Sequence, residues 1–161
     1  MKDFSMKLHN FQLLILRLAL GGLFLSIGLE KIHEGWLVNP EQLLQSLNNY
    51  HLRATGPQLT YLTTVALPYA GLWTKLIAIG ETAIGASLLI GLLARSSSFM
   101  AIFMVLNFHA ANGNLFSLNF FGSPWGALPI AGLLAVFLAR AGRWAGVDAL
   151  LAKSNAKGVL W

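Results

Sequence analysis

Long apolar runs separated by short polar segments dominate this chain and define its expected elements. Four of these runs approach the roughly 17 to 25 residues that a membrane-spanning helix needs. They cover residues 11–30, 71–93, 99–115 and 124–140. The pattern predicts an all-α fold, an integral membrane four-helix bundle, in a single membrane domain over residues 1–161.

The connection between the first two spans has a different pattern. It opens with Asn-Pro-Glu, which combines a capping residue, a proline and an acidic residue as helix starts often do. Leu43, Leu47 and Tyr50 then recur on one helical face. We therefore expect an amphipathic helix over residues 40–55 that lies on the membrane surface. The segment 57–68 is bounded by prolines and too short to span, so it should be a surface helix or a re-entrant piece.

Composition supports a membrane protein. Hydrophobic residues make up 56% of the chain and charged residues only 11%, far from the balance of a soluble domain. The net charge of +5 comes from residues scattered at the ends of apolar runs, so we expect no nucleic-acid partner. Because the chain has no cysteine, disulfides and thiolate-ligated cofactors within it are excluded.

The distribution of basic residues predicts the topology. With four spans, both termini and the loop near residue 95 share one side, which the positive-inside rule makes cytoplasmic. We expect a bacterial or archaeal inner membrane protein that contacts the lipid bilayer and other membrane or periplasmic subunits. A signal peptide is the competing interpretation of the first run, but Arg17 and the absence of a cleavage motif disfavour it. The basic residues on the cytoplasmic side would be Lys2, Lys7, Arg95, Arg140, Arg143, Lys153 and Lys157.

Three ionisable residues within the runs are candidate catalytic residues: Glu81, His109 and Arg17. A charged side chain at the bilayer centre costs roughly 2.5–3.5 kcal/mol on insertion scales, so it normally has a partner. Glu81 lies near the middle of the second run, and Arg17, two turns inside the first, is its expected partner. His109 lies at a similar depth on the third run. A purely structural polar core explains the same residues without any reaction.

A quinone is the cofactor that these residues fit, since its reduction needs hydrogen-bond donors and two protons. The candidate cofactor-binding residues are His109, Asn107, Asn112 and Lys31. Lys31 is equally explained by snorkelling to the headgroups, and Asn112 by capping a helix end. One histidine within the spans cannot form a bis-histidine haem site, although it could be a single axial ligand to a pigment. No metal site is predicted, since no HExxH motif is present.

Three stretches resemble the DoxX family, including its DoxD branch, the membrane subunit of thiosulfate:quinone oxidoreductase. They are RLALGGLFLSIGLEKI, GETAIGASLLIGLLARSSS and GRWAGVDALL. The resemblance implies a four-helix membrane bundle in which Arg17, Lys31, Glu81 and Asp148 occupy matching polar positions. The long connection after the first span is similar to that of the DoxD type.

Two functions of different classes follow. The first, which the resemblance implies, is a membrane subunit of a quinone-linked oxidoreductase, with an extracytoplasmic donor such as thiosulfate. The alternative is a non-catalytic accessory subunit of a larger respiratory or photosynthetic complex, contacting a pigment or lipid at the bundle surface. A small transporter is disfavoured, because four spans without broken inverted repeats lack the usual transporter architecture.

Overall fold

The structure is a computed structural model that describes residues 2–115, 117–144 and 146–154, with side chains from residue 10 onward. These residues form helices and turns without strands. Lys157, one of the residues on which the topology prediction rests, lies outside the described residues. The elements in chain order are α1 (Lys2–His33), α2 (Glu41–His51), α3 (Gly56–Tyr61), the π-helical η1 (Leu62–Ala66), α4 (Ala70–Ile90), α5 (Ala94–Ala111), α6 (Leu118–Gly122), α7 (Ala127–Ala139), the 3₁₀-helical η2 (Ala141–Arg143) and α8 (Val147–Ser154).

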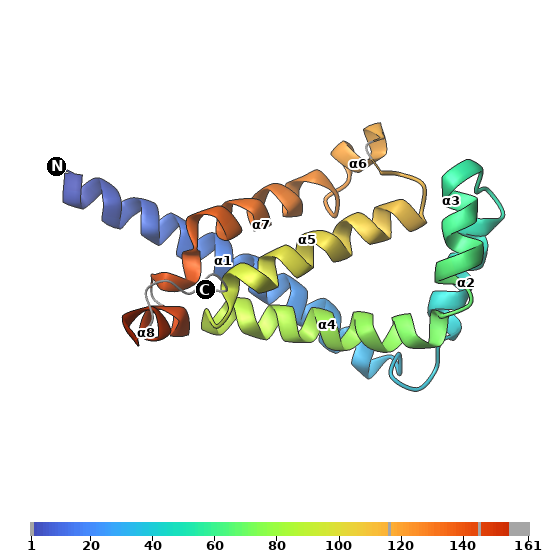
Figure 1. The fold of residues 1–161 in the computed structure, drawn as a ribbon, viewed down its shortest axis with the longest axis horizontal. Helices are drawn as coiled ribbons and strands as arrows, with labels where there is room; N and C mark the ends of the chain where they lie inside the picture. The colour runs from blue at the N-terminus through green and yellow to red at the C-terminus, as the bar shows by residue number, and fades with distance from the viewer. Residues whose placement is uncertain (1, 116, 145, 155–161) are drawn as a thin grey trace.

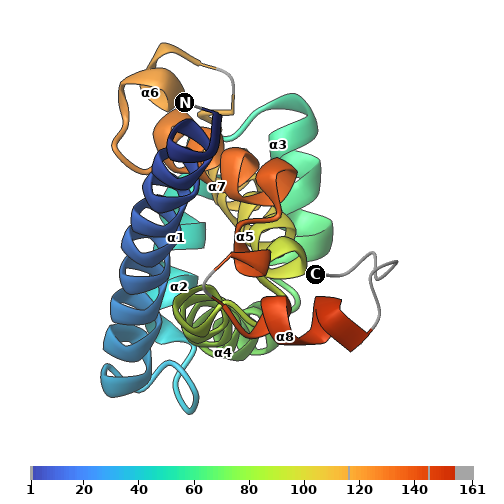
Figure 2. The same ribbon diagram turned by 90° about the vertical axis from the view of Figure 1, so that its left-hand side faces the viewer.

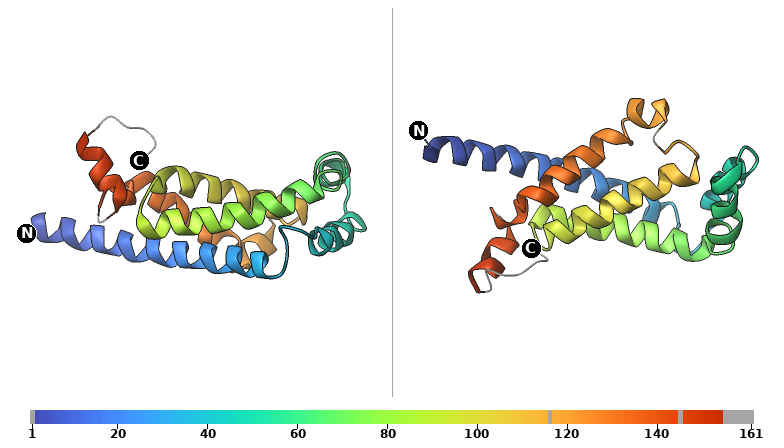
Figure 3. Two further views of the ribbon diagram at one scale, coloured as in Figure 1. Left: turned by 90° about the horizontal axis from the view of Figure 1, so that it is seen from below. Right: turned by 45° about the horizontal axis from the view of Figure 1, so that its top comes forward.

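The long helices α1, α4, α5 and α7 pack side by side (Figures 1 and 2). Helix α1 runs along α4, α5 runs along α7, and contacts of α1 with α7 and of α4 with α5 complete the arrangement. Helices α2 and α3 lie across the far end, where α4 begins and α5 ends (Figure 3). The N-terminus, the α4–α5 turn, the end of α7 and α8 gather at the opposite end (Figure 1). We call these the α2–α3 end and the α8 end.

Two of the described helices are long and apolar enough to cross a membrane, as judged by length and composition. They are Asn10–His33 within α1 and Ala70–Ile90, which is α4. Helix α7 is apolar but shorter. Helix α5 has 18 residues, yet its Ser-rich start and polar end lower its hydropathy. Membrane-type helices are therefore present, and the four-span arrangement stays a prediction.

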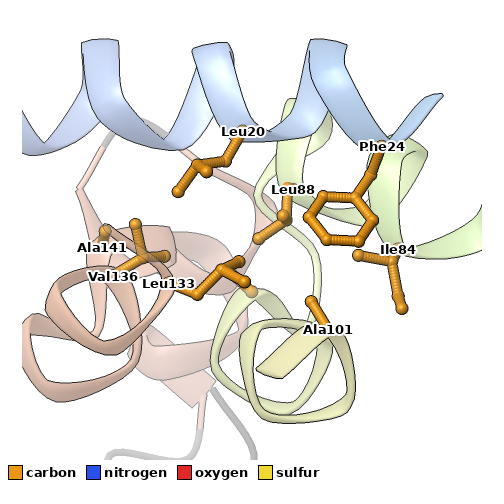
Figure 4. Close-up of a cluster of buried hydrophobic side chains, with 9 residues drawn as sticks. Leu20, Phe24, Ile84, Leu88, Ala101, Leu133, Val136 and Ala141 are labelled. Atoms are coloured by element: carbon orange, nitrogen blue, oxygen red, sulfur yellow. The ribbon is translucent and has the colours of Figure 1, made fainter. Parts of the chain in front are cut away.

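The core between the long helices is formed by interlocking aliphatic side chains, shown in Figure 4. Leu88 of α4 and Leu133 of α7 are fully buried, and Leu20 and Phe24 of α1 close over them. Lipid tails are as apolar as these side chains, so packing contacts rather than transfer from water hold such helices together. A tight fit between helices is consequently important.

Glycines bring α1 and α4 into close contact. A Cβ at Gly28 would collide with the backbone of Thr82, and one at Gly85 would collide with the backbone of Leu25. Other small residues of α4, Gly80 and Ala83 among them, line a groove facing α5. The seam between α1 and α4 therefore depends on Gly28 and Gly85.

The third apolar run is shifted from its predicted bounds of 99–115. Helix α5 begins at Ala94, so the polar segment Arg95–Ser98 forms its first turn rather than a loop. The start is set by Asp148, whose carboxylate accepts hydrogen bonds from the backbone N–H groups of Leu93 (2.7 Å) and Ala94 (2.9 Å). A carboxylate at a helix N-terminus satisfies orphan donors and opposes the helix dipole.

The predicted surface helix corresponds to α2. Its start is held by Asn39, whose Oδ1 accepts a hydrogen bond from the Glu41 backbone N–H at 3.0 Å. Leu43 and Leu47 are buried against η1 and the start of α4. The apolar face of α2 thus packs on the protein, and the segment 57–68 folds as α3 and η1.

Candidate functional site

A cavity of about 450 Å³ lies between α1, α4, α5 and the start of α7. Its apolar wall includes Phe24, Met104 and Phe108. We call it the polar cavity, because several hydrogen-bonding side chains meet there from elements far apart in sequence. These polar lining residues are Glu30, Lys31, Glu81, His109, Asn112 and Ser123.

An ion pair between Lys31 and Glu81 forms one side of the polar cavity. The Lys31 Nζ lies 2.6 Å from Oε1 and 2.5 Å from Oε2 of Glu81, which is only 4% exposed. The pair forms because Gly28, one turn before Lys31, lets α1 rest on the α4 backbone at Thr82. Lys31, rather than the predicted Arg17, is therefore the partner of the membrane carboxylate.

Aromatic rings flank the Lys31 ammonium. It lies 5.2 Å from the ring centroid of Trp36 and 5.3 Å from that of Phe108, within the range of cation–π attraction. Trp36 is fixed by the turn after α1, where its backbone N–H donates to the Lys31 carbonyl at 3.1 Å. Its indole N–H also donates to Glu34 and Gln42. No sequence pattern indicated Trp36 as a site residue, because its position beside Lys31 depends on this turn.

His109 contributes the other polar side of the cavity. Its side chain is 7% exposed, and its Nε2 lies 3.1 Å from the backbone carbonyl oxygen of Trp125. A carbonyl can only accept, so Nε2 carries the proton and Nδ1 of the neutral ring is an acceptor. Within the described residues Nδ1 is buried and has no hydrogen-bond partner. The edge-on ring of Phe120, with its centroid 4.9 Å away, holds the imidazole in place.

The two candidate asparagines, Asn107 and Asn112, line different spaces. Asn112 lines the polar cavity and follows α5, with its Oδ1 accepting the Asn114 backbone N–H at 2.9 Å. Asn107 instead accepts a hydrogen bond from the Tyr61 hydroxyl at 2.9 Å and lines an apolar groove between α4 and α5. Asn107 and His109, both candidate cofactor-binding residues, therefore line different spaces on α5.

Arg17 belongs to a second buried cluster, at the α8 end. It is 1% exposed and donates to the Ala141 carbonyl oxygen at 3.0 Å. The carboxylate of Asp148, also 1% exposed, interacts with it electrostatically. The prediction that Arg17 joins Glu81 and His109 around one headgroup is therefore wrong. The resemblance had pointed to Asp148, but nothing in the spacing showed that it would lie beside Arg17.

The polar cavity can hold a ligand with polar atoms at two separated points. Lys31 can donate, Glu81 can accept or donate a proton, and the His109 Nδ1 can accept. Across the described residues, no three His, Asp or Glu side chains are grouped to bind a metal ion.

Comparisons with known proteins place most of this site within one family. The model of the DoxX family matches residues 12–112, a range that includes Lys31, Glu81 and His109 but not Asp148. Searches of curated proteins and of solved structures found no match.

Proposed function

The chain belongs to the DoxX family, a membrane-associated family, and on that premise we propose that it is the membrane subunit of a quinone-linked oxidoreductase. The quinone ring would occupy the polar cavity. The observation that carries this proposal is that His109, whose buried Nδ1 has no partner among the described residues, lines the same cavity as the Lys31–Glu81 ion pair. Leaving such a group unsatisfied costs about 1–3 kcal/mol, which a bound donor would recover.

The residues fit a quinone ring. The volume of about 450 Å³ falls within the range of about 300–1,000 Å³ that is usual for small-molecule sites. Phe108 and Trp125 supply apolar surface, while polar groups stand on two sides. The Lys31 ammonium can donate a hydrogen bond to a carbonyl oxygen of the oxidised ring, and the His109 Nδ1 can accept one from a hydroxyl of the reduced ring.

Proton handling would fall to Glu81 and His109. A bound quinone takes up two electrons and two protons to become the quinol, while a donor on a partner subunit loses two electrons. Glu81 could hold a proton at one ring oxygen and His109 at the other, because both line the cavity. Thiosulfate is the donor that the family resemblance suggests.

The membrane arrangement completes the proposal. We assign α1, α4, α5 and α7 as four spans of a bacterial or archaeal inner membrane, with both termini cytoplasmic. Arg95, in the first turn of α5, Arg140, at the end of α7, and Arg143, in η2, support this orientation, because these segments gather at the α8 end (Figure 1). The α2–α3 end would then face the periplasm, where a partner subunit could deliver electrons.

Binding to purified protein in lipid nanodiscs tests the quinone assignment. Decylubiquinone and decylubiquinol would be titrated while tryptophan fluorescence is followed, since Trp125 lines the cavity. Two substitutions separate the functions of His109. His109→Gln keeps a donor toward the Trp125 carbonyl but removes the Nδ1 acceptor, whereas His109→Asn places a polar group near the Nδ1 position.

The expected result is a loss of quinol affinity in His109→Gln of about threefold to tenfold, equivalent to one neutral hydrogen bond. His109→Asn should retain more of that affinity, and the exposed His33→Gln should match wild type. Glu81→Gln should lower the affinity for both forms. Equal binding by all variants, or no binding by wild type, would refute the proposal. Isolation only within a large pigment-bearing assembly, without quinone binding, would favour the accessory-subunit hypothesis.

A further inference from the structure

A second hollow, of about 640 Å³, lies between α4 and α5, which diverge toward the α2–α3 end (Figure 1). We call it the apolar groove, because its lining is almost entirely hydrocarbon. It exists because α4 presents small residues, Gly80 and Ala83, toward α5. Helix α4 also packs much more extensively on α1 than on α5.

Hydrogen-bonded side chains line both ends of the apolar groove. At the α2–α3 end, the Tyr61 hydroxyl bonds to Asn107, beside Leu43 and Leu47 of α2. Toward the α8 end, the hydroxyls of Ser87 and Ser97 lie 2.6 Å apart. The groove thus runs along the helices with a polar pair at each end and an apolar lining between them, which suits an extended apolar chain.

The apolar groove and the polar cavity share two lining residues, Met104 and Phe108 of α5. These side chains form the partition between the two spaces. Phe108 also lies against the Lys31 ammonium, so the partition stands beside the ion pair. Methionine has three rotatable bonds and adapts readily to a neighbouring ligand. On the groove side, a Cβ at Gly80 would lie 3.6 Å from the Met104 sulfur.

We propose that the apolar groove takes the hydrocarbon tail of the quinone whose ring occupies the polar cavity, with the tail passing between Met104 and Phe108. This inference rests on the proposed function. An amphiphile with a compact polar ring at one end and an apolar chain fits the juxtaposition of the two spaces. A phospholipid acyl chain in the groove would leave the polar cavity unoccupied, so it would not link the two spaces. The ring would enter from the bilayer between α4 and α5.

Gly80→Leu tests the tail assignment. Leucine would fill the groove against Met104 without adding a group to the lining of the polar cavity, and it favours the helix by about 1 kcal/mol relative to glycine. Gly22→Leu is the matched control, because Gly22 lies on α1 with nothing near its Cβ position. The probes are decylubiquinone and the tail-less 2,3-dimethoxy-5-methyl-1,4-benzoquinone, with fluorescence titration in nanodiscs as the measurement.

The expected result is that Gly80→Leu weakens decylubiquinone binding by about tenfold or more, since leucine occupies space that the tail would contact. Its affinity for the tail-less quinone should stay within about twofold of wild type, and Gly22→Leu should change neither affinity. If Gly80→Leu affected both quinones equally, or neither, the tail assignment alone would be overturned. If wild type bound neither quinone, the proposed function and this inference would fail together.

Discussion

The Asp148 carboxylate should be among the most stabilising polar groups in the described structure. It is 1% exposed, accepts the backbone N–H groups of Leu93 and Ala94, and lies close to the equally buried Arg17. Its own backbone N–H also donates to the Gly91 carbonyl at 2.8 Å. The segment around α8 is therefore tied to the α4–α5 turn by one residue that is distant from that turn in sequence.

Replacing Asp148 with alanine removes both acceptors and leaves the Arg17 cation without the nearby carboxylate. Removing one member of a buried charged pair costs about 3–5 kcal/mol. Asp148→Asn keeps one acceptor oxygen and should cost about 1.5–3 kcal/mol, the range for a lost hydrogen bond to a charged group. With about 2–4 °C per kcal/mol for a chain of this size, Asp148→Ala should lower the Tm by about 6–20 °C.

Thermal unfolding of detergent-solubilised protein, followed by far-UV circular dichroism, measures this loss. Glu41→Gln is the control, because Glu41 is an exposed carboxylate on α2 and should shift the Tm by no more than about 2 °C. A double variant with Arg17→Met and Asp148→Asn should be less destabilised than the sum of its single variants, since no buried charge is left alone. If Asp148→Ala had the same Tm as the wild type, the carboxylate would contribute nothing to stability.

Three further predictions concern the seam, the ion pair and the topology. Gly28→Ala should cost about 1–3 kcal/mol by overpacking against α4, whereas Gly22→Ala should cost nothing; both are read from thermal unfolding. Lys31→Gln and Glu81→Gln should each lower the free energy of unfolding by about 3–5 kcal/mol. A charge-swapped double variant should recover most of that loss; if it does not, the ion pair is not the source of this stability. Because the native chain has no cysteine, Val38→Cys gives a single thiol at a position 88% exposed. An impermeant maleimide should label it in intact cells; labelling only after permeabilisation would reverse the proposed orientation.

The helical segments were predictable because long apolar runs report directly on membrane-type helices. The runs at 11–30 and 71–93 correspond closely to the spanning parts of α1 and α4. The start of α5 was not predictable, because it depends on Asp148, which follows the turn by 54 residues. No local pattern reports such a distant cap.

The partner of Glu81 shows where sequence reasoning stops within the site. Helical spacing puts Arg17 and Lys31 on one side of the first helix, and both are largely buried there. They are 14 residues apart, or about 21 Å along a helix, so only one can meet Glu81. The choice is made by Gly28, which fixes where α1 and α4 touch. Periodicity shows which residues share a face of a helix, but not how far that helix is shifted along its axis relative to a neighbour.

The hydrogen bonding of His109 likewise depends on a contact that its helix does not contain. Its position on α5 and its depth were evident from the apolar run, but the state of its two nitrogens depends on a loop carbonyl. The Trp125 carbonyl fixes the proton on Nε2 and leaves Nδ1 as an acceptor. The sequence could therefore suggest His109 as a site residue without indicating which ligand atom it would bind.

The two buried polar clusters differ in whether they border the polar cavity, which Lys31, Glu81 and His109 line and Arg17 and Asp148 do not. At Asp148, both carboxylate oxygens have backbone donors, and Arg17 bonds to a carbonyl, so that cluster serves as a structural tie. At His109, a buried acceptor has no donor among the residues that the structure describes, and the neighbouring ion pair borders a cavity. Substitution at Asp148 should therefore change the Tm and leave quinone affinity intact, while His109→Gln should do the reverse. If both substitutions altered the same property, the division into a structural and a functional cluster would be wrong, because burial alone would then determine their effects.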